Sequence, residues 1–339
     1  MQRFVRSLII FSLLTSASYP VLSNPVREPV KTASTDDLLA LLPESDFLGI
    51  VDAGRAFTDL LPRLKSIWPS GFASLTRGLE SFTTKTGIDP TQLKSAVFGA
   101  KMTGSGSGQG VVILQGANVD PKRVEAAVQL EKGEFKTQDY KGKSIFTVIP
   151  PPPPPAPKPE SGSEPAKQPE KASPLSFSLL GNQIVAVGDI PCIQSVLDNQ
   201  AAPPKTNPNA QLGAALKETK SGLLRFAAVL PESLRQSLSG NGDLFKQIAA
   251  VKMILGSFDF ANDFSAALDT RLRTASASDA SQLESSLKSL VVLAKSFLGN
   301  DQKLAVFSQL LDQVTIAAQS NDVKLNVAVP RALIDQLGK

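Results

Sequence analysis

The residues that could perform chemistry are few in this chain. Its 339 residues include no histidine and a single cysteine, Cys192. The absence of histidine excludes Ser-His-Asp and Cys-His triads, histidine bases and histidine-ligated metals. One cysteine also excludes intrachain disulfides, zinc sites built from cysteines and iron–sulfur clusters. Cys192 follows a proline at an expected helix start, where a thiol can be activated, but a small buried apolar residue is the better interpretation.

Two short strings resemble motifs of serine β-lactamases and penicillin-binding proteins. They are Ser285-Ser-Leu-Lys288 and Lys85-Thr86-Gly87, and a lysine beside a serine could replace histidine as the base. The order argues against this interpretation, because the Lys-Thr-Gly string should follow the nucleophile and here precedes it. We therefore attribute the match to chance.

The carboxylates are the remaining candidates for acid–base chemistry. Glu44, Asp46 and Asp52 surround the first expected strand, and Asp259 and Asp263 flank an expected hairpin turn. Asp is favoured at turns and helix caps, so we expect structural roles. We predict no catalytic, cofactor-binding or metal-binding residues, and we expect that the protein is not an enzyme.

A glycine-rich string, Gly104-Ser-Gly-Ser-Gly108, could cradle a phosphate. Phosphate loops join a strand to a helix, whereas both flanks of this string are typical of strands. It is therefore expected to be a hairpin tip.

The first residues predict export. Arg3 and Arg6 precede the apolar run Leu8–Leu14, and small residues follow it. This pattern is typical of a secretory signal peptide over residues 1–23, with cleavage before Asn24 or nearer Ala17. The alternative, an uncleaved anchor, has too short an apolar run, and no later segment is long enough for an integral span. We expect a periplasmic or secreted protein of the bacterial envelope.

Composition narrows the partners. The net charge is +4, lysines and arginines are scattered, and the chain has one tryptophan and two tyrosines. A nucleic-acid binder needs a clustered basic surface, so nucleic acid is not an expected partner.

Two proline-containing segments divide the chain. The Pro-rich segment 150–174 is expected to be a disordered insertion, with a docking ligand for a Pro-binding groove as the alternative. The predicted organisation is a signal peptide (1–23), an N-terminal segment (24–45), a first repeat (46–200), a linker (201–221) and a second repeat (222–339).

Each predicted repeat follows one order of elements: strand, helix, two strands, helix, strand. At the end of each copy, Asn182 and Pro191 align without gaps to Asn321 and Pro330. The predicted fold class is α+β, with two tandem βαββαβ (ferredoxin-like) repeats, antiparallel sheets and helices packed on one face. The two halves are expected to bury separate cores.

Three strings resemble an uncharacterised family of exported bacterial proteins. They are Leu41–Asp52, with a Leu-Pro-x-x-x-Asp strand entry, Tyr140–Ile145, with a Tyr-x-Gly hairpin, and Asn182–Asp189, which ends in Val-Gly-Asp. The resemblance covers residues 38–200 and implies export and architecture only.

Three function classes stay open. The first is a non-catalytic envelope protein with an interaction or scaffold role and a protein partner. The second is a carrier of an apolar ligand or lipid, held between sheet and helix. The third is a hydrolase that uses paired carboxylates.

Overall fold

The structure is a computed structural model and describes residues 33–102, 108–151, 174–181, 183–239, 243–298 and 305–337. The predicted signal peptide and most of both the glycine-rich tip and the Pro-rich insertion lie outside the described residues, as does Asn182. No helix of the described ranges is long and apolar enough to cross a membrane.

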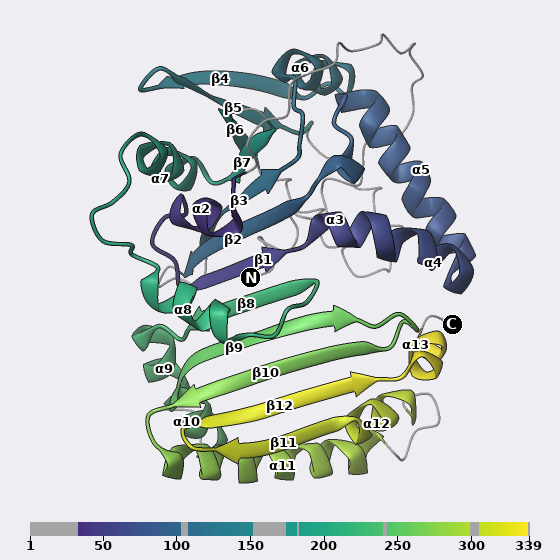
Figure 1. Cartoon of the computed structure of the whole chain (residues 1–339), viewed down its shortest axis with the longest axis vertical. Helices are drawn as coiled ribbons and strands as arrows, with labels where there is room; N and C mark the ends of the chain where they lie inside the picture. The colour runs from purple at the N-terminus through teal and green to yellow at the C-terminus, as the bar shows by residue number, and fades with distance from the viewer. Residues whose placement is uncertain are drawn as a thin grey trace, which may run out of the picture.

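Twelve strands form one sheet (Figure 1), in the order β11-β12-β10-β9-β8-β1-β2-β3-β7-β6-β5-β4. Every pairing between these neighbours is antiparallel. The strands are β1 (Phe47–Val51), β2 (Ser95–Met102), β3 (Gly108–Gln115), β4 (Glu134–Tyr140), β5 (Lys143–Ile149), β6 (Leu175–Gly181), β7 (Ile184–Gly188), β8 (Leu224–Val229), β9 (Val251–Phe260), β10 (Ala266–Thr274), β11 (Val314–Gln319) and β12 (Asp322–Val329).

The described helices lie on both faces of this sheet. They are α2 (Thr35–Ala40), α3 (Ala53–Arg55), the π-helical turn η2 (Ala56–Leu60), α4 (Leu61–Ile67), α5 (Pro69–Thr86), the 3-10 turn η3 (Pro90–Gln92), α6 (Pro121–Leu130), α7 (Ile190–Ala201), α8 (Ala210–Glu218), α9 (Glu232–Ser239), α10 (Asp243–Ala249), α11 (Ala277–Leu298), α12 (Ala305–Asp312) and α13 (Arg331–Leu337). The α+β class and the antiparallel sheet are thus confirmed.

The two halves of the chain join at the pairing of β1 with β8. Leu48 lies opposite Ala227, and Gly49 lies opposite Phe226. Leu48 and Ala227 are fully buried in one core that extends to Leu255 of β9. The prediction of two separate cores is therefore wrong, because pairing satisfies the backbone groups of two edges that would otherwise be exposed.

The strand order also differs from the ferredoxin-like prediction. In the first half β1, β2 and β3 form a meander, and β7, β6, β5 and β4 follow beyond it. In the second half β8, β9 and β10 form a meander, followed by β12 and β11. The helices between strands do not return the chain to a parallel neighbour, as a βαβ crossover would. The predicted duplication stays a prediction, although the matching order of the two meanders and their following hairpins fits it.

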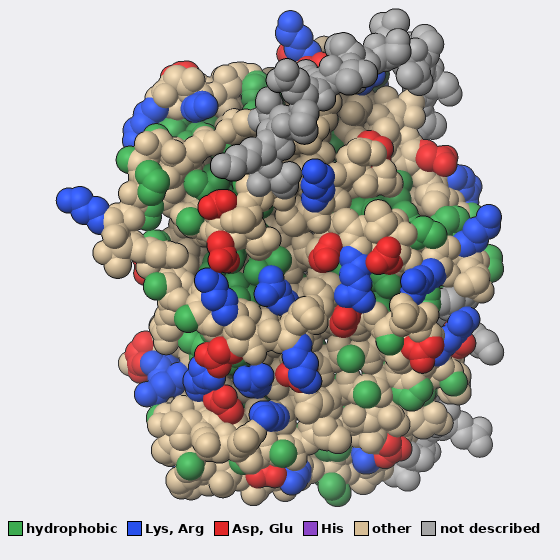
Figure 2. Space-filling model, in the orientation of Figure 1, with side chains coloured by type: hydrophobic (Ala, Val, Ile, Leu, Met, Phe, Trp, Pro, Cys, Tyr) green, Lys and Arg blue, Asp and Glu red, His purple; other side chains and the backbone are tan. Residues whose placement is uncertain are grey.

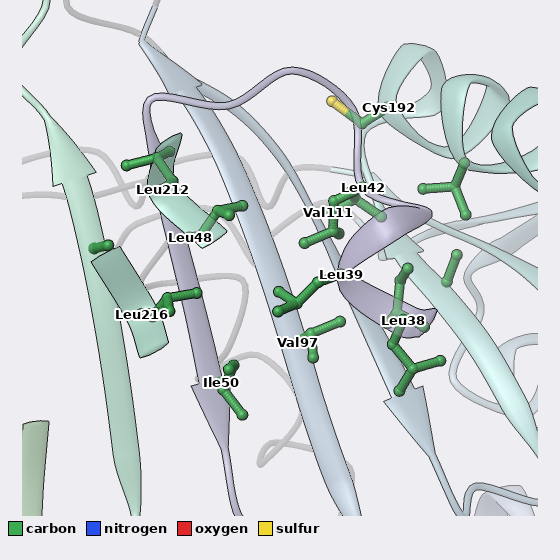
Figure 3. Packing of buried hydrophobic residues seen from close by; sticks show 14 of the residues in the cluster. Leu38, Leu39, Leu42, Leu48, Ile50, Val97, Val111, Cys192, Leu212 and Leu216 are labelled. Carbon is green, nitrogen blue, oxygen red and sulfur yellow. The ribbon is translucent and has the colours of Figure 1, made fainter. Parts of the chain in front are cut away.

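The central core lies on the face that α2, α7 and α8 cover (Figure 3). Leu48, Val97 and Val111 of the sheet are buried there beneath Leu38 of α2 and Leu216 of α8. Each such leucine contributes about 1.5–3 kcal/mol relative to an exposed one. No helix was predicted in either segment: α2 lies in the N-terminal segment (24–45) and α8 in the predicted linker (201–221).

Alternate residues of the same strands face the other side, where α6 and α11 cover two further cores. One contains Val124 and Val128 of α6 with Phe177 of β6. The other contains Ala280 and Leu283 of α11. The prediction that helices pack on one face is wrong, since strands with apolar residues at successive positions need cover on both faces.

Aromatic rings cover part of this second face near the seam. The Phe98 ring lies over Gly49 of the neighbouring strand, and the Phe226 ring lies over Gly256. A side chain at either glycine would collide with the ring. Phe47 packs between these rings, with centroid distances of 5.5 Å to Phe98 and 6.3 Å to Phe226.

Short-range sequence features account for several local structures. Gly87 ends α5 in the left-handed conformation, with φ of 71°, which glycine adopts without steric cost. The carboxylates of Asp89 and Asp120 cap the helical segments that begin at the following prolines. The helical stretch is irregular near Pro62, where the π-helical turn η2 precedes α4.

Candidate functional site

The face of the sheet that carries α8 is open over β10, β12 and β11. Figure 2 shows lysine, arginine and acidic side chains interspersed on the lower part of this face. β10 alternates Asp269, Arg271 and Arg273 with Leu268 and Leu272. Its apolar residues face the side of α11, so the charged residues stay on the open side. The alternation of charged and apolar residues along β10 is the sequence pattern that indicates this charged surface.

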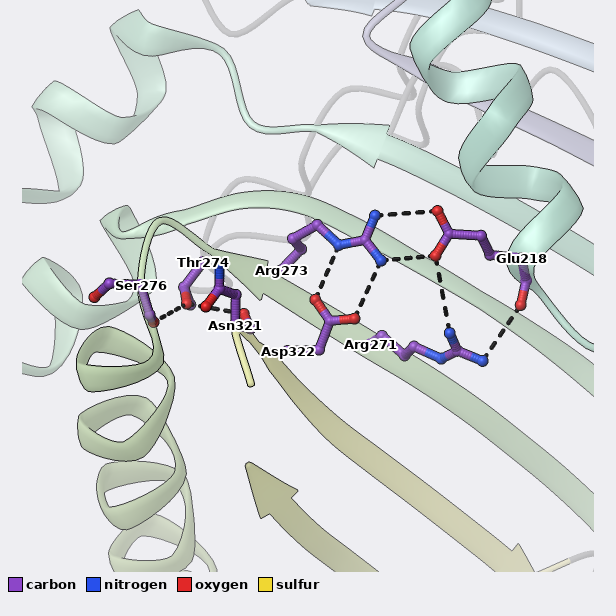
Figure 4. A network of polar contacts seen from close by, with 7 residues as sticks. All are labelled: Glu218, Arg271, Arg273, Thr274, Ser276, Asn321 and Asp322. Carbon is purple, nitrogen blue, oxygen red and sulfur yellow. Dashed lines mark hydrogen bonds and ion pairs between the residues drawn. The ribbon is translucent and has the colours of Figure 1, made fainter. Parts of the chain in front are cut away.

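An ion-pair network crosses this open face (Figure 4). Arg273 donates to both carboxylate oxygens of Glu218, at 2.7 and 3.2 Å, and to both of Asp322, at 2.9 and 3.1 Å. Glu218 is the last residue of α8, whereas Asp322 begins β12. One guanidinium therefore ties the helix to the second half of the sheet through two bidentate pairs.

These contacts change the titration of both partners. Hydrogen bonding from Arg273 holds the pKa of Glu218 below its ordinary value of 4.5. Glu218 and Asp322 raise the pKa of Arg273. Glu218 is thus held ionised, and the hydrogen bonds from Arg273 occupy both carboxylates, which makes the pair unsuited to proton transfer.

An open pocket of about 520 Å³ adjoins the network. The side chains that line it come from β10 and from the hairpin of β11 and β12: Arg271, Arg273, Gln319, Ser320, Asn321, Asp322 and Lys324. Three of the seven are cationic and one is acidic. Sequence reasoning singled out Asn321 only as a turn residue and missed this pocket, because the three elements meet only in the folded sheet.

A second surface is apolar and lies on the helices of the opposite face. Leu290, Leu293 and Phe297 of α11 have exposed fractions of 37%, 52% and 72%. Their spacing places them on one side of the helix. We call these three residues the α11 stripe. Phe307 of α12, a helix that packs against α11, is also exposed.

The candidate nucleophiles take part in structural contacts. The Ser285 hydroxyl donates to the carbonyl of Ser281 on the exposed side of α11, and Lys288 pairs with Glu284. Lys85 pairs with Glu131, and Thr86 donates to the Phe82 carbonyl. Cys192 is buried, and burial raises the pKa of its thiol to about 11, which leaves it protonated at neutral pH.

The candidate carboxylates occupy caps, turns and ion pairs. Asp52 caps α3, and Asp46 accepts from the backbone N–H of Met102 at 2.8 Å. Glu44 pairs with Lys101. Asp259 pairs with Arg55 at 2.7 Å, whereas Asp263 accepts from Ser265 within the hairpin turn. Turn and cap roles account for these residues.

The Tyr-x-Gly hairpin has a docking role within the fold. The Tyr140 hydroxyl donates to Asp198 of α7 at 3.0 Å, and Lys141 pairs with the same carboxylate at 2.7 Å. Gly142 adopts a positive φ of 78°. Lys141 and Tyr140 hold the pKa of Asp198 below its ordinary value. This motif fixes the tip of β4 and β5 on α7.

Comparisons with known proteins assign no family. No protein-family model and no curated protein matches the chain. Among solved structures the chain is similar to TP0453 in its crystal form I, at 8% identity and a TM-score of 0.40. The match covers 88% of this chain and 95% of that one. A likeness of this strength carries no argument about function.

Proposed function

We propose that this chain is a non-catalytic, exported protein of the bacterial envelope that acts by binding a protein partner. The α11 stripe is the observation that carries the proposal. Large apolar side chains exposed side by side on one helix typically mark an interaction surface. Burying Leu293 and Phe297 against a partner would supply about 1.5–3 kcal/mol each before the cost of association.

The rest of the proposal draws on the sequence and the site. Export rests on Arg3, Arg6 and the Leu8–Leu14 run. A non-catalytic role is supported by the occupied carboxylates and by the protonated, buried thiol of Cys192. The resemblance to exported bacterial proteins points the same way.

A protein partner is favoured over an enclosed apolar ligand. The pocket at the open face and a smaller one of about 230 Å³ beside Cys192 both include charged side chains. Lipid carriers instead surround their ligand with apolar side chains. The α11 stripe, in contrast, is exposed to solvent, and a docking surface for another protein must be exposed.

The test is site-specific photo-crosslinking in the bacterial envelope. A photoreactive residue at Leu293 should give one adduct of defined mass, and Leu290→Ser with Phe297→Ser should abolish it. The matched control is the same photoreactive residue at Ser281, which is exposed on the first half of α11. Failure to recover the mature chain from the envelope fraction would refute the location. Equal crosslinking from both positions, or none from Leu293, would refute the surface.

A further inference from the structure

Two cations face each other across the open face of the sheet. Arg271 of β10 and Lys324 of β12 are direct register partners in an antiparallel pair. Such partners point to the same face with Cβ atoms about 4.5–5.5 Å apart. Both side chains line the pocket. Like charges in this arrangement repel and destabilise the pair unless a negative charge lies between them.

The neighbouring carboxylates supply that charge to Arg271 only in part. Glu218 and Asp322 are both engaged by Arg273, and the Glu218 carboxylate makes a long ion pair of 3.9 Å with Arg271 (Figure 4). Arg271 also donates at 3.3 Å to the main-chain carbonyl of Glu218. Asp269, the acidic side chain of β10, pairs with Lys220 at 2.5 Å.

Lys324 has neither a carboxylate nor a hydrogen-bond partner within the described part of the chain. The residue is nevertheless half-buried and lines the pocket. With Glu218 counted beside the pocket, the cations Arg271, Arg273 and Lys324 exceed the carboxylates Glu218 and Asp322 by one positive charge. Arg273 lies between the carboxylates of Glu218 and Asp322. Its positive charge reduces the electrostatic repulsion between these carboxylates and an incoming anion.

Neutral donors complete the lining. Gln319, Ser320 and Asn321 come from the end of β11 and the turn into β12. The main-chain carbonyl of Asn321 accepts from Thr274, which anchors the turn against β10 (Figure 4). Amide and hydroxyl groups on an anchored turn can donate to an anion without reorganisation.

We propose that this pocket binds an oxyanion group, phosphate or carboxylate, between Arg271 and Lys324. The guanidinium presents a planar pair of N–H donors to two oxygens of the ligand. The Lys324 ammonium contributes a second positive charge from the opposite strand, and Asn321 and Ser320 supply neutral donors. The site is independent of the α11 stripe, which lies on the other face of the sheet.

Calorimetric titration of the full chain with inorganic phosphate and with succinate, at matched low ionic strength, tests this site. We expect saturable binding of at least one of the two anions. Lys324→Gln should weaken it by about tenfold or more, since a charge-assisted hydrogen bond is lost. Saturation by phosphate alone would assign a phosphate group, and saturation by succinate alone would assign a carboxylate.

The matched control is Lys288→Gln, which removes the same charge from an exposed site on α11. Its affinity should stay within about twofold of the parent, because this ammonium lies outside the pocket. Thermal melting supplies a second readout: the anion should raise the Tm of the parent more than that of Lys324→Gln, because weaker binding stabilises the folded state less. No saturable binding by either anion, or equal weakening by both variants, would overturn the proposal.

Discussion

The strands β7, β6 and β5 and the strands β10, β12 and β11 differ in how their faces are covered. In the first region α7 buries Ile193 on one face, and α6 buries Val128 on the other. In the second region α11 covers one face, whereas Arg271 and Lys324 remain on the other. In a strand that helices cover on both faces, the side chains of both faces are used for packing. In a strand that helices cover on one face only, the side chains of the other face remain available to bind a ligand. The candidate oxyanion site lies on such an uncovered face.

The largest expected effect comes from cutting the chain between its halves. A fragment of Ser221–Lys339 keeps β8 to β12 but loses β1, the partner of β8, and all of α8. We expect it to aggregate and to show no cooperative urea transition, because β8 becomes an unpaired apolar edge.

A longer fragment, beginning at Asn207, serves as the control for that experiment. It restores α8 but leaves β8 without β1, so it should also aggregate. A soluble fragment with a cooperative transition and mixed helix and strand in circular dichroism would show that the singly covered region is an independent domain.

Two truncations to alanine, one at an isoleucine and one at a leucine, compare how much each region's packing contributes to the free energy of unfolding. Ile193→Ala removes a fully buried side chain from the doubly covered region. It should lower the free energy of unfolding by about 2–5 kcal/mol in urea titrations. Leu293→Ala, at a 52% exposed position of α11, should change it by less than about 0.5 kcal/mol. Similar losses at both sites would mean that the α11 stripe is packed within the monomer.

The ion-pair network should have a smaller effect on stability. Arg273→Ala removes the link between α8 and β12 and leaves two carboxylates without their partner. We expect a loss of about 1 kcal/mol in the free energy of unfolding, since the side chains are partly exposed to solvent. The control, Lys288→Gln, removes one exposed pair within α11 and should cost only about 0.3 kcal/mol. A loss no larger than that of the control would show that α8 stays in place without the network.

The smallest effect is a dependence on pH. Folding lowers the pKa of Glu218 below 4.5, so its stabilising contribution is present above that pH and is lost as the pH falls through the folded value. Glu218→Gln should therefore lower the Tm at pH 7, and its difference from the parent should shrink in acid. A difference that stays constant from pH 7 to pH 3 would exclude a role for this ionisation.

Local patterns account for many of the observed turns, caps and strands. The cap at Gly87, the prolines after Asp89 and Asp120 and the alternation along β10 each depend on a few neighbouring residues. The missed helix α8 had such a signal too, since Leu212, Ala215 and Leu216 repeat at helical spacing. The prolines upstream favoured a linker instead. Each half also contains enough apolar residues for a core, which favoured two separate units.

By itself the sequence determined the class of elements, the turns and caps, and the exclusion of histidine and disulfide chemistry, because these depend on residue type and short-range spacing. Only the tertiary structure decided that β1 pairs with β8, since hydrogen bonding between strand edges is available to any exposed strand. It also brought Arg271 beside Lys324, because a register between distant strands depends on the whole sheet. The oxyanion site exists only once that register has formed.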